Sequence, residues 1–229
     1  MALYVIGDLH LSLSGDKPMD VFGEKWANHV ERTRQGFAEL RDDDVTVLAG
    51  DSSWGMSLEA AREDFAFIDA LPGKKLLLKG NHDYWWGTAA KMKRFFAGQG
   101  FDTLDILHNN CFFYGDYALC GTRGWFYEED AKGTHTGKML AREALRLETS
   151  FKAAEGRPIL CFLHYPPLYQ GYQCPELLTL IDRYHAQRCY YGHLHGVTHR
   201  RAFEGKRSFT EYALVSADYL GFVPKKILD

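Results

Sequence analysis

The sequence of 229 residues predicts an α/β fold, and its first third supplies the main observations. Three apolar runs, Leu3–Ile6, Val45–Ala49 and Leu76–Leu78, each lead within two residues to a glycine followed by Asp or Asn. Apolar runs without polar alternation are typical of strands covered on both faces. Residues with helical spacing lie between the runs, and this strand–helix–strand order predicts a parallel sheet with right-handed crossovers.

Two stripes of mostly apolar residues predict the helices between these strands. Their members recur at intervals of three and four, which places them on one face of a helix. The first stripe contains Trp26, Val30, Thr33, Phe37 and Leu40, and the second contains Leu58, Ala61, Phe65 and Ile68. We expect Ser57 to cap the second helix and Pro72–Gly73 to end it.

The second half of the chain predicts a further sheet. The run from Phe112 to Gly121 predicts a hairpin that turns at Gly115–Asp116. Another helical stripe follows at Leu140, Ala144, Leu147 and Phe151. The later strands are expected at Ile159–Leu163 and Cys189–Tyr191, with closing antiparallel strands at Val197–Phe203 and Phe209–Val215. We therefore expect one domain over residues 1–229, with two sheets packed together and helices outside.

The composition excludes several classes of protein. Hydrophobic residues make up 46% and charged residues 25% of the chain, which is ordinary for a globular domain and unlike disordered or coiled-coil proteins. The 27 basic and 30 acidic side chains give a net charge of −3, which argues against a protein that coats nucleic acid. We expect no membrane segment and no signal peptide, and five cysteines without Cys-x-x-Cys spacing predict reduced thiols and a cytoplasmic location.

Five short segments carry residues suited to chemistry, and each follows a predicted strand. Because open α/β sheets place their ligands at the carboxyl ends of their strands, we expect these segments to converge on one edge. The segments are Asp8-Leu9-His10, Gly50-Asp51, Gly80-Asn81-His82-Asp83, His164 and Gly192-His193-Leu194-His195.

Metal binding is the chemistry that this residue set favours. Carboxylates, imidazoles and one amide, without thiolates, suit divalent ions such as Mn²⁺, Fe²⁺ or Zn²⁺. Taken singly, a Gly-Asp pair is also common in turns, and a lone histidine is usually a core residue. The combination of all five segments at strand ends favours the metal site. The candidate ligands are Asp8, His10, Asp51, Asn81, His164, His193 and His195.

These segments resemble, in the same order, the motifs of the calcineurin-like metallophosphoesterases. The resemblance implies a four-layer α/β/β/α sandwich with two metal ions, Mn²⁺ being favoured, and Asp51 shared between them. It implies that Asp8, His10, Asp51 and His195 hold one ion, and that Asp51, Asn81, His164 and His193 hold the other. His82 matches the catalytic histidine of the family, and Asp83 is expected to orient it.

The expected activity is hydrolysis of phosphate mono- or diesters of a small molecule, such as a nucleotide. Two cations would activate a hydroxide for attack on phosphorus, and a protonated His82 would give a proton to the leaving oxygen. Lys79 and Arg123 are candidate phosphate contacts, although each is also consistent with an ordinary structural or surface charge. Aromatic residues near the motifs are expected either to stack on substrate or to form the cleft walls. They are Trp54, Tyr84, Trp85, Trp86, Trp125 and Phe126.

Two other functions remain open at this stage. A DNA or RNA nuclease would need a basic groove, which the net charge does not support, so nucleic acid is not the expected partner. An inactive scaffold of the same fold would be expected to have lost a motif residue, most tellingly His82, and none is missing. The segment Gly50–Gly55 lacks the pattern of the protein Ser/Thr phosphatases, which disfavours that branch of the family.

Overall fold

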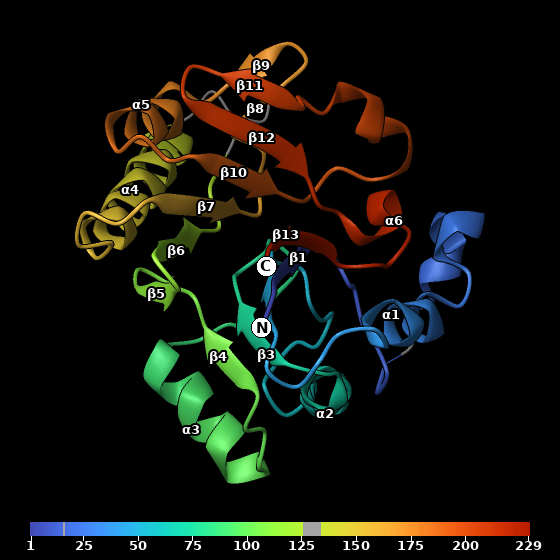
Figure 1. The fold of residues 1–229 in the computed structure, drawn as a ribbon. Coiled ribbons are helices and arrows are strands. Elements are labelled where there is room, and N and C mark those ends of the chain that lie inside the picture. Colours follow the sequence, from blue (N-terminus) through green and yellow to red (C-terminus); the bar gives the residue numbers. More distant parts are fainter. Residues whose placement is uncertain (16, 126–133) are drawn as a thin grey trace.

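The computed structural model describes residues 1–15, 17–125 and 134–229, with the side chains of 134–136 left out (Figure 1). The predicted aromatic residue Phe126 lies outside this part of the chain. The described strands form two large sheets and one small hairpin. No helix in the described part is both long and apolar enough to cross a membrane.

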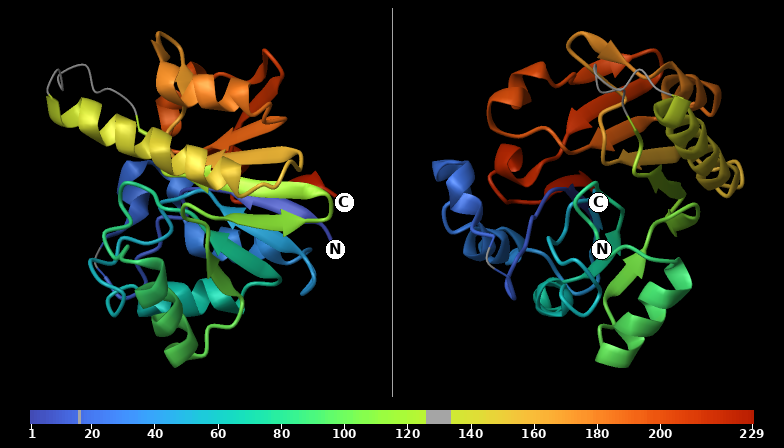
Figure 2. Two further views of the ribbon diagram at one scale, coloured as in Figure 1. Left: turned by 90° about the vertical axis from the view of Figure 1, so that its left-hand side faces the viewer. Right: turned by 180° about the vertical axis from the view of Figure 1, so that it is seen from behind.

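The first sheet contains the three parallel strands expected from the first third of the sequence. Its order is β13-β1-β2-β3-β4, in which β1 to β4 run parallel and β13 runs antiparallel to β1. The strands are β1 (Leu3–Ile6), β2 (Val45–Leu48), β3 (Lys74–Leu77), β4 (Leu104–Ile106) and β13 (Lys225–Leu228). Pairing of β1 with β13 brings the two chain termini side by side (Figure 2).

The second sheet has the order β11-β12-β10-β7-β6-β5. Its four inner strands are parallel, and both edge strands are antiparallel to their neighbours. The strands are β5 (Cys111–Tyr114), β6 (Tyr117–Thr122), β7 (Ile159–Leu163), β10 (Arg188–Tyr191), β11 (Gly205–Arg207) and β12 (Thr210–Leu214). A separate hairpin pairs β8 (Leu168–Tyr169) with β9 (Tyr172–Gln173).

The helices cover the outer faces of the two sheets (Figures 1 and 2). The α-helices are α1 (His29–Phe37), α2 (Arg62–Ala70), α3 (Ala89–Gln99), α4 (Thr134–Lys152), α5 (Pro175–Arg183) and α6 (Ala217–Leu220). Short 3₁₀ helices are η1 (Met19–Phe22), η2 (Glu24–Trp26) and η3 (Gly196–Arg201). One core packs α1, α2 and α3 on the first sheet, and another packs α4 and α5 on the second.

A third core lies between the two sheets. Val5 and Val47 from the first sheet pack there with Leu160 and Phe162 from the second, and all four are fully buried. Burial on both faces explains why these strands have no polar alternation. The layers therefore follow the order α/β/β/α, as the sequence predicted.

Several sequence predictions for individual elements were wrong. The segment predicted as a strand at Val197–Phe203 instead begins with η3, because Gly196 has a φ of +52° and the His195 and Thr198 side chains cap the turn reciprocally. The strand predicted at Phe209–Val215 exists as β12, which pairs antiparallel with β11 as expected and parallel with β10 on its other side. Ser57 caps the turn that precedes α2, through a bond from the Ala60 amide to its Oγ, and not α2 itself.

The first predicted helix also begins later than its apolar stripe. Trp26 belongs to η2, and α1 begins only at His29. The elements α3, α5, β4 and β13 were not among those predicted from the sequence. The apolar stripes of α3 and α5 were nevertheless present in the sequence, at Met92 and Phe96 and at Leu177 and Ile181.

Candidate metal centre

The site forms where the carboxyl ends of the two sheets meet. The Gly7 amide donates to the Val215 carbonyl at 2.7 Å, and the Ala217 amide donates to the Gly7 carbonyl at 2.9 Å. These bonds join the end of β1 to the end of β12, its counterpart in the other sheet. As a result, Asp8 lies beside the loop after β10, and the His193 amide donates to Asp8 Oδ2 at 3.0 Å.

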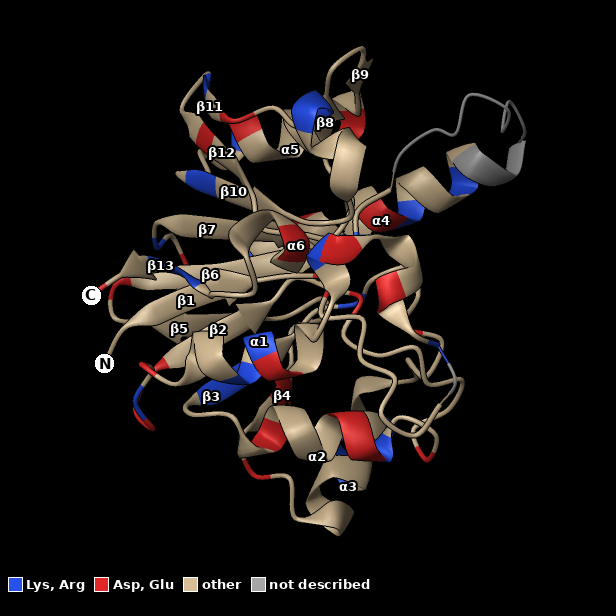
Figure 3. Cartoon of the chain, turned by 90° about the vertical axis from the view of Figure 1, so that its right-hand side faces the viewer, with Lys and Arg blue, Asp and Glu red and all other residues tan. Residues whose placement is uncertain are grey.

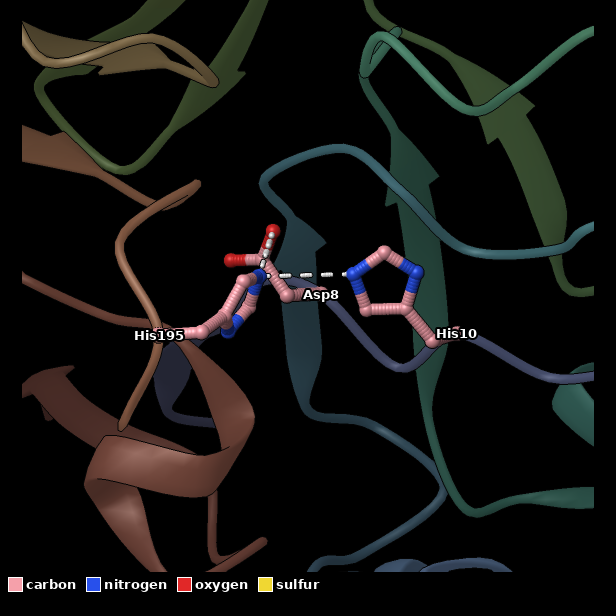
Figure 4. Close-up of side chains that lie close together, drawn as sticks. All are labelled: Asp8, His10 and His195. Atoms are coloured by element: carbon pink, nitrogen blue, oxygen red, sulfur yellow. Dashed lines mark hydrogen bonds and ion pairs between the residues drawn. The ribbon is translucent and has the colours of Figure 1, made fainter. Parts of the chain in front are cut away.

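The structure brings the predicted ligands together as two groups of donor side chains. Within each group, one donor atom from each residue lies within 4.8 Å of the others. We call Asp8, His10 and His195 the pocket-side group, drawn in Figure 4, and Asp51, His164 and His193 the inner group. The seventh predicted ligand, Asn81, joins the inner group because its Oδ1 is 2.7 Å from His164 Nε2.

Asp51 lies between the two groups. Its Oδ2 is 3.7 Å from His10 Nε2 in one group and 3.4 Å from His164 Nε2 in the other. This oxygen is buried and has no hydrogen-bond partner among the described residues. A buried carboxylate oxygen without a partner is costly, so its environment fits a bound cation shared by both groups.

The backbone holds several of these residues in an unusual conformation. Asp8, His10, Asp51 and His193 have φ values of 62°, 49°, 51° and 72°, in the left-handed region that L-residues seldom adopt. Hydrogen bonds between loops maintain it, including one from the His10 amide to the Asp51 carbonyl at 2.9 Å. Such strain is concentrated at functional sites, where surrounding structure enforces it.

Two glycines allow the loops to approach the carboxylates closely. A Cβ at Gly80 would lie 2.0 Å from Asp51 Oδ1, and a Cβ at Gly192 would lie 2.3 Å from Asp8 Oδ2. Any side chain at either position would displace a candidate ligand. The glycines that precede Asn81 and His193 in the sequence motifs are therefore required by packing.

Hydrogen bonds orient two of the imidazoles toward the centre. His164 Nδ1 donates to the Ala49 carbonyl at 3.1 Å, which leaves Nε2 as an acceptor facing Asn81 Oδ1. His164 Nε2 and Asn81 Oδ1 are both acceptors, and a cation between them would stabilise this arrangement. His195 Nδ1 lies 2.9 Å from Asp218 Oδ1, which likewise leaves Nε2 directed at the centre. Carboxylates and carbonyls commonly hold metal-binding histidines in this way.

Burial and charge give the histidines different protonation states. Burial lowers the pKa of His193 to about 3. Burial also lowers the pKa of His10 and His164, so these rings are neutral, as metal ligands must be. At His195, burial is outweighed by the carboxylates of Asp8 and Asp218, which raise its pKa to about 10.

Asp218 is a functional residue that the sequence analysis missed. Besides its bond to His195, it accepts a hydrogen bond from the Gly196 amide at 3.0 Å, and so fixes the loop that carries the last motif. A signal was present, because Ser216-Ala217-Asp218 directly follows a predicted strand, as the other motifs do.

His82 lies at the edge of the centre. Its amide donates to Asp51 Oδ1 at 2.7 Å, and its ring centroid is 4.2 Å from that of Trp54. Burial lowers the pKa of His82 to about 4. The protonated His82 expected from the sequence is therefore not the state of the free site near neutral pH. A phosphate beside the ring would raise this pKa again, because negative charge favours the imidazolium.

Orientation of His82 by Asp83 stays a prediction, and the structure shows other partners for this carboxylate. Its carboxylate accepts hydrogen bonds from the backbone amides of Asp51 at 2.9 Å and Gly80 at 2.7 Å, and from Trp85 Nε1 at 3.0 Å. The His82 ring instead has the Tyr84 hydroxyl 3.4 Å from its Nδ1. Asp83 therefore clamps two ligand-bearing loops together. Burial, followed by the charge of Asp51, raises its pKa to about 7.

The two predicted phosphate contacts, Arg123 and Lys79, are not freely exposed cations. Arg123 is mostly buried, lies 3.6 Å from the fully buried Glu143, and stacks over the Trp125 ring. Lys79 is half-buried, and burial, followed by the charge of Arg123, lowers its pKa. Arg123 is thus already paired with a carboxylate, and contact with phosphate stays a prediction for both residues.

The aromatic residues near the motifs divide between core and site. Trp85 is buried in the core against Phe65, with ring centroids 4.7 Å apart. Trp54 stacks on His10 at 5.1 Å and belongs to the site. Trp26, which was predicted only as part of a helical stripe, also contacts the site, 5.5 Å from the His195 ring.

An α/β/β/α sandwich with such donors at the carboxyl ends of its inner strands has the architecture of the metallophosphatases. Solved structures share this fold over nearly their whole length. The phosphopantetheinyl hydrolase of Mycobacterium tuberculosis aligns with a TM-score of 0.58 at 16% identity, covering 99% of this chain and 95% of that one. A protein of unknown function from Aquifex aeolicus has a TM-score of 0.53 at 14% identity, covering 98% and 95%.

A third solved structure, protein TT1561 of Thermus thermophilus, aligns with a TM-score of 0.56 at 12% identity and covers 99% and 97%. No curated protein matches the sequence. The model of the calcineurin-like phosphoesterase family matches residues 1–197. The chain therefore belongs to the calcineurin-like phosphoesterase family, as its motifs predicted.

Proposed function

We propose that the protein hydrolyses phosphate mono- or diesters of a small molecule with the help of two divalent cations. The observation that carries this proposal is the position of Asp51, whose unpaired buried oxygen lies between two groups of donors. A lone structural ion would not require two groups, whereas a pair of ions that shares a carboxylate would use both.

The pocket-side group and Asp51 would hold one cation, and the inner group with Asn81 would hold the other. The donors are oxygens and imidazole nitrogens, which suit Mn²⁺, Fe²⁺ or Zn²⁺, and among these we favour Mn²⁺. When bound, the two cations would lower the pKa of the attacking water and stabilise charge on the phosphoryl oxygens.

His82 would complete the reaction at the leaving oxygen. Attack of water forms a new P–O bond, the P–O bond to the alcohol breaks, and water releases one proton. The leaving alkoxide takes up one proton, which His82 is placed to donate once substrate charge has raised its pKa. Asp83 would contribute by holding the ligand-bearing loops of Asp51 and Gly80, and not by acting on the proton.

Nucleic acid is a less suitable substrate. The net charge is −3, and basic and acidic residues are interspersed along the ribbon in Figure 3. A nuclease would be expected to have a continuous basic groove beside its centre. The intact His82 also argues against an inactive scaffold.

Metal-stripped protein supplied with Mn²⁺ tests the proposal. We expect hydrolysis of p-nitrophenyl phosphate or bis(p-nitrophenyl) phosphate to appear with Mn²⁺ and to disappear with chelator. Asp102→Asn, which changes an exposed carboxylate, serves as the matched control and should retain activity. Full activity after exhaustive removal of metal would contradict the two-cation proposal, and inactivity on a broad panel of phosphoesters would contradict the function itself.

A further inference from the structure

A cavity of about 720 Å³ opens directly beside the pocket-side group. Its lining includes the imidazoles of His10, His82 and His195, so it is continuous with the candidate centre. The volume lies within the range of about 300–1,000 Å³ that is usual for small-molecule sites. We call this cavity the aromatic pocket, because two tryptophans, Trp26 and Trp54, form part of its wall.

The two tryptophans are held firmly in place. Trp26 is only 3% exposed and meets the rings of His10 and Phe222 edge-on, at 5.6 Å and 5.4 Å. Trp54 stacks on His10, and its Nε1 donates to Met19 Sδ at 3.3 Å. Trp26 is almost fully buried and Lys17 Nζ lies 4.2 Å from the centroid of the Trp54 ring, so the two rings form a fixed wall of the pocket and not an open stacking face.

Two large apolar side chains stand at the rim of the aromatic pocket. Phe22 at the end of η1 is 67% exposed, and Val197 in η3 is 72% exposed. These residues come from segments far apart in the sequence, yet both line the same cavity. Exposed apolar side chains gathered beside a cavity are typical of a binding groove.

The position of His82 indicates which part of a substrate the pocket receives. In an in-line displacement the leaving oxygen lies opposite the attacking water, next to the group that protonates it. His82 is in the pocket wall, 4.2 Å from the Trp54 ring, so an alcohol that leaves toward His82 enters this cavity. The pocket is therefore positioned for the leaving group and not for the phosphate.

We propose that the aromatic pocket binds the leaving alcohol of the substrate, and that this alcohol carries a flat aromatic or heteroaromatic ring. The inference rests on the proposed phosphoesterase function and adds the class of alcohol. The rim residues Phe22 and Val197 hold the ring against the fixed tryptophan wall, while His82 meets the ester oxygen. A small aliphatic alcohol would leave these surfaces uncovered.

The test compares substrates with the same phosphate and alcohols of similar acidity. 2-Phenylethyl phosphate and its methyl diester are compared with ethyl phosphate and its methyl diester. The enzyme is expected to hydrolyse either the two monoesters or the two diesters. Within that pair, kcat/KM should be roughly 10–100-fold higher for the 2-phenylethyl substrate than for the ethyl substrate, mainly because its KM is lower. Equal values for ring-bearing and ethyl substrates would overturn the inference and leave the proposed function intact.

Variants at the rim assign the preference to this pocket. Phe22→Ala and Val197→Ala should each reduce the ratio of the two kcat/KM values by roughly 3–10-fold. Phe209→Ala and Val223→Ala are matched controls, because both side chains are exposed apolar residues outside the pocket lining, and the ratio should stay at its wild-type value. An unchanged ratio in both rim variants would overturn the assignment.

A binding measurement separates this inference from the proposed function. 2-Phenylethylphosphonate has a P–C bond in place of the ester and is not hydrolysed, so quenching of tryptophan fluorescence reports its binding without turnover. We expect saturable quenching that weakens in Phe22→Ala and not in Phe209→Ala. Loss of all hydrolysis with this quenching intact would contradict only the proposed function, whereas absence of quenching would contradict the pocket.

Discussion

The two histidines of the Gly192–His195 motif differ sharply although only one residue separates them. His193, in the inner group, has a pKa lowered to about 3 by burial. At His195, in the pocket-side group, burial is outweighed by Asp8 and Asp218, and the pKa is raised to about 10. Sequence proximity thus does not determine the chemistry of a ligand, because the residue behind each ring decides its charge.

The surroundings of the two groups differ as well. Each group has two buried members and one half-buried histidine, which is His193 in the inner group and His195 in the pocket-side group. The pocket-side group faces the aromatic pocket through His10 and His195. We infer that the inner group acts mainly as a fixed anchor, whereas the pocket-side group is the one that responds to pH and substrate. The predictions below test this difference.

The largest effect is expected from Asp51→Asn, which acts on both groups at once. Loss of the shared charge should remove metal from both groups and lower kcat by about 10⁴-fold or more, since each cation contributes several kcal/mol. Metal content by elemental analysis, alongside kcat, checks this outcome. Retention of two ions per chain would show that the groups do not depend on a shared carboxylate, and Asp102→Asn controls for the substitution itself.

His82→Ala should separate chemistry from metal binding. We expect two ions to remain bound, and kcat on an alkyl phosphoester to fall by roughly 10²–10⁴-fold. The loss should be much smaller on an aryl ester, whose leaving oxygen needs little protonation. Paired measurements of kcat on both esters, with metal content, decide the matter. Metal loss in this variant would make His82 a ligand of the pocket-side group.

The strand ends of the site were predictable from sequence because strong local signals converge there. Apolar runs buried on both faces, followed by glycine and then Asp51 or Asn81, indicate strand ends whatever the rest of the fold. Asp83 belongs to the same motif, yet its role was not predictable, because its partners are amides of a loop about thirty residues away. Every residue except proline has a backbone N–H group, so the sequence does not indicate which amides a carboxylate will bind.

The pocket wall was the part least accessible from sequence. Trp26 has the spacing of a helical core residue, and only the junction of the two sheets brings it against His195. The Val197–Phe203 segment has apolar residues at both ends and was interpreted as a strand. Its actual turn depends on Gly196 and on the cap between His195 and Thr198, and Val197 is left exposed beside the pocket.

Asp218→Asn should weaken only the pocket-side group. The amide cannot hold the His195 ring with the same charge, and loss of such a carboxylate typically costs about 10–100-fold in metal affinity. Mn²⁺ titration should therefore show one weakened binding step and one unchanged step. Equal weakening of both steps would contradict the division into two groups. Asp102→Asn again provides the control, because its carboxylate is exposed.

A change of one pH unit gives the smallest expected effect, and it distinguishes the two steps of metal binding in the wild-type protein. Between about pH 6 and pH 8 the pH lies below the pKa of His195, which is about 10. The ring therefore carries a proton that the metal ion must displace. Affinity at the pocket-side group should therefore fall about tenfold for each unit by which pH decreases. His193, with a pKa of about 3, is already neutral and adds no such dependence to the inner group.

Asp51 does not remove this difference in pH dependence between the two groups. Burial raises the pKa of Asp51, but any proton that it releases on metal binding affects both groups, because Asp51 is shared by them. Electron paramagnetic resonance of free Mn²⁺ measures the two affinities at each pH. In Asp218→Asn the pH dependence of the pocket-side step should become shallower, since loss of one carboxylate lowers the pKa of His195. Equal slopes for the two steps in the wild-type protein would mean that His195 is neutral before metal binds, and the two groups would then differ only in their contact with the aromatic pocket.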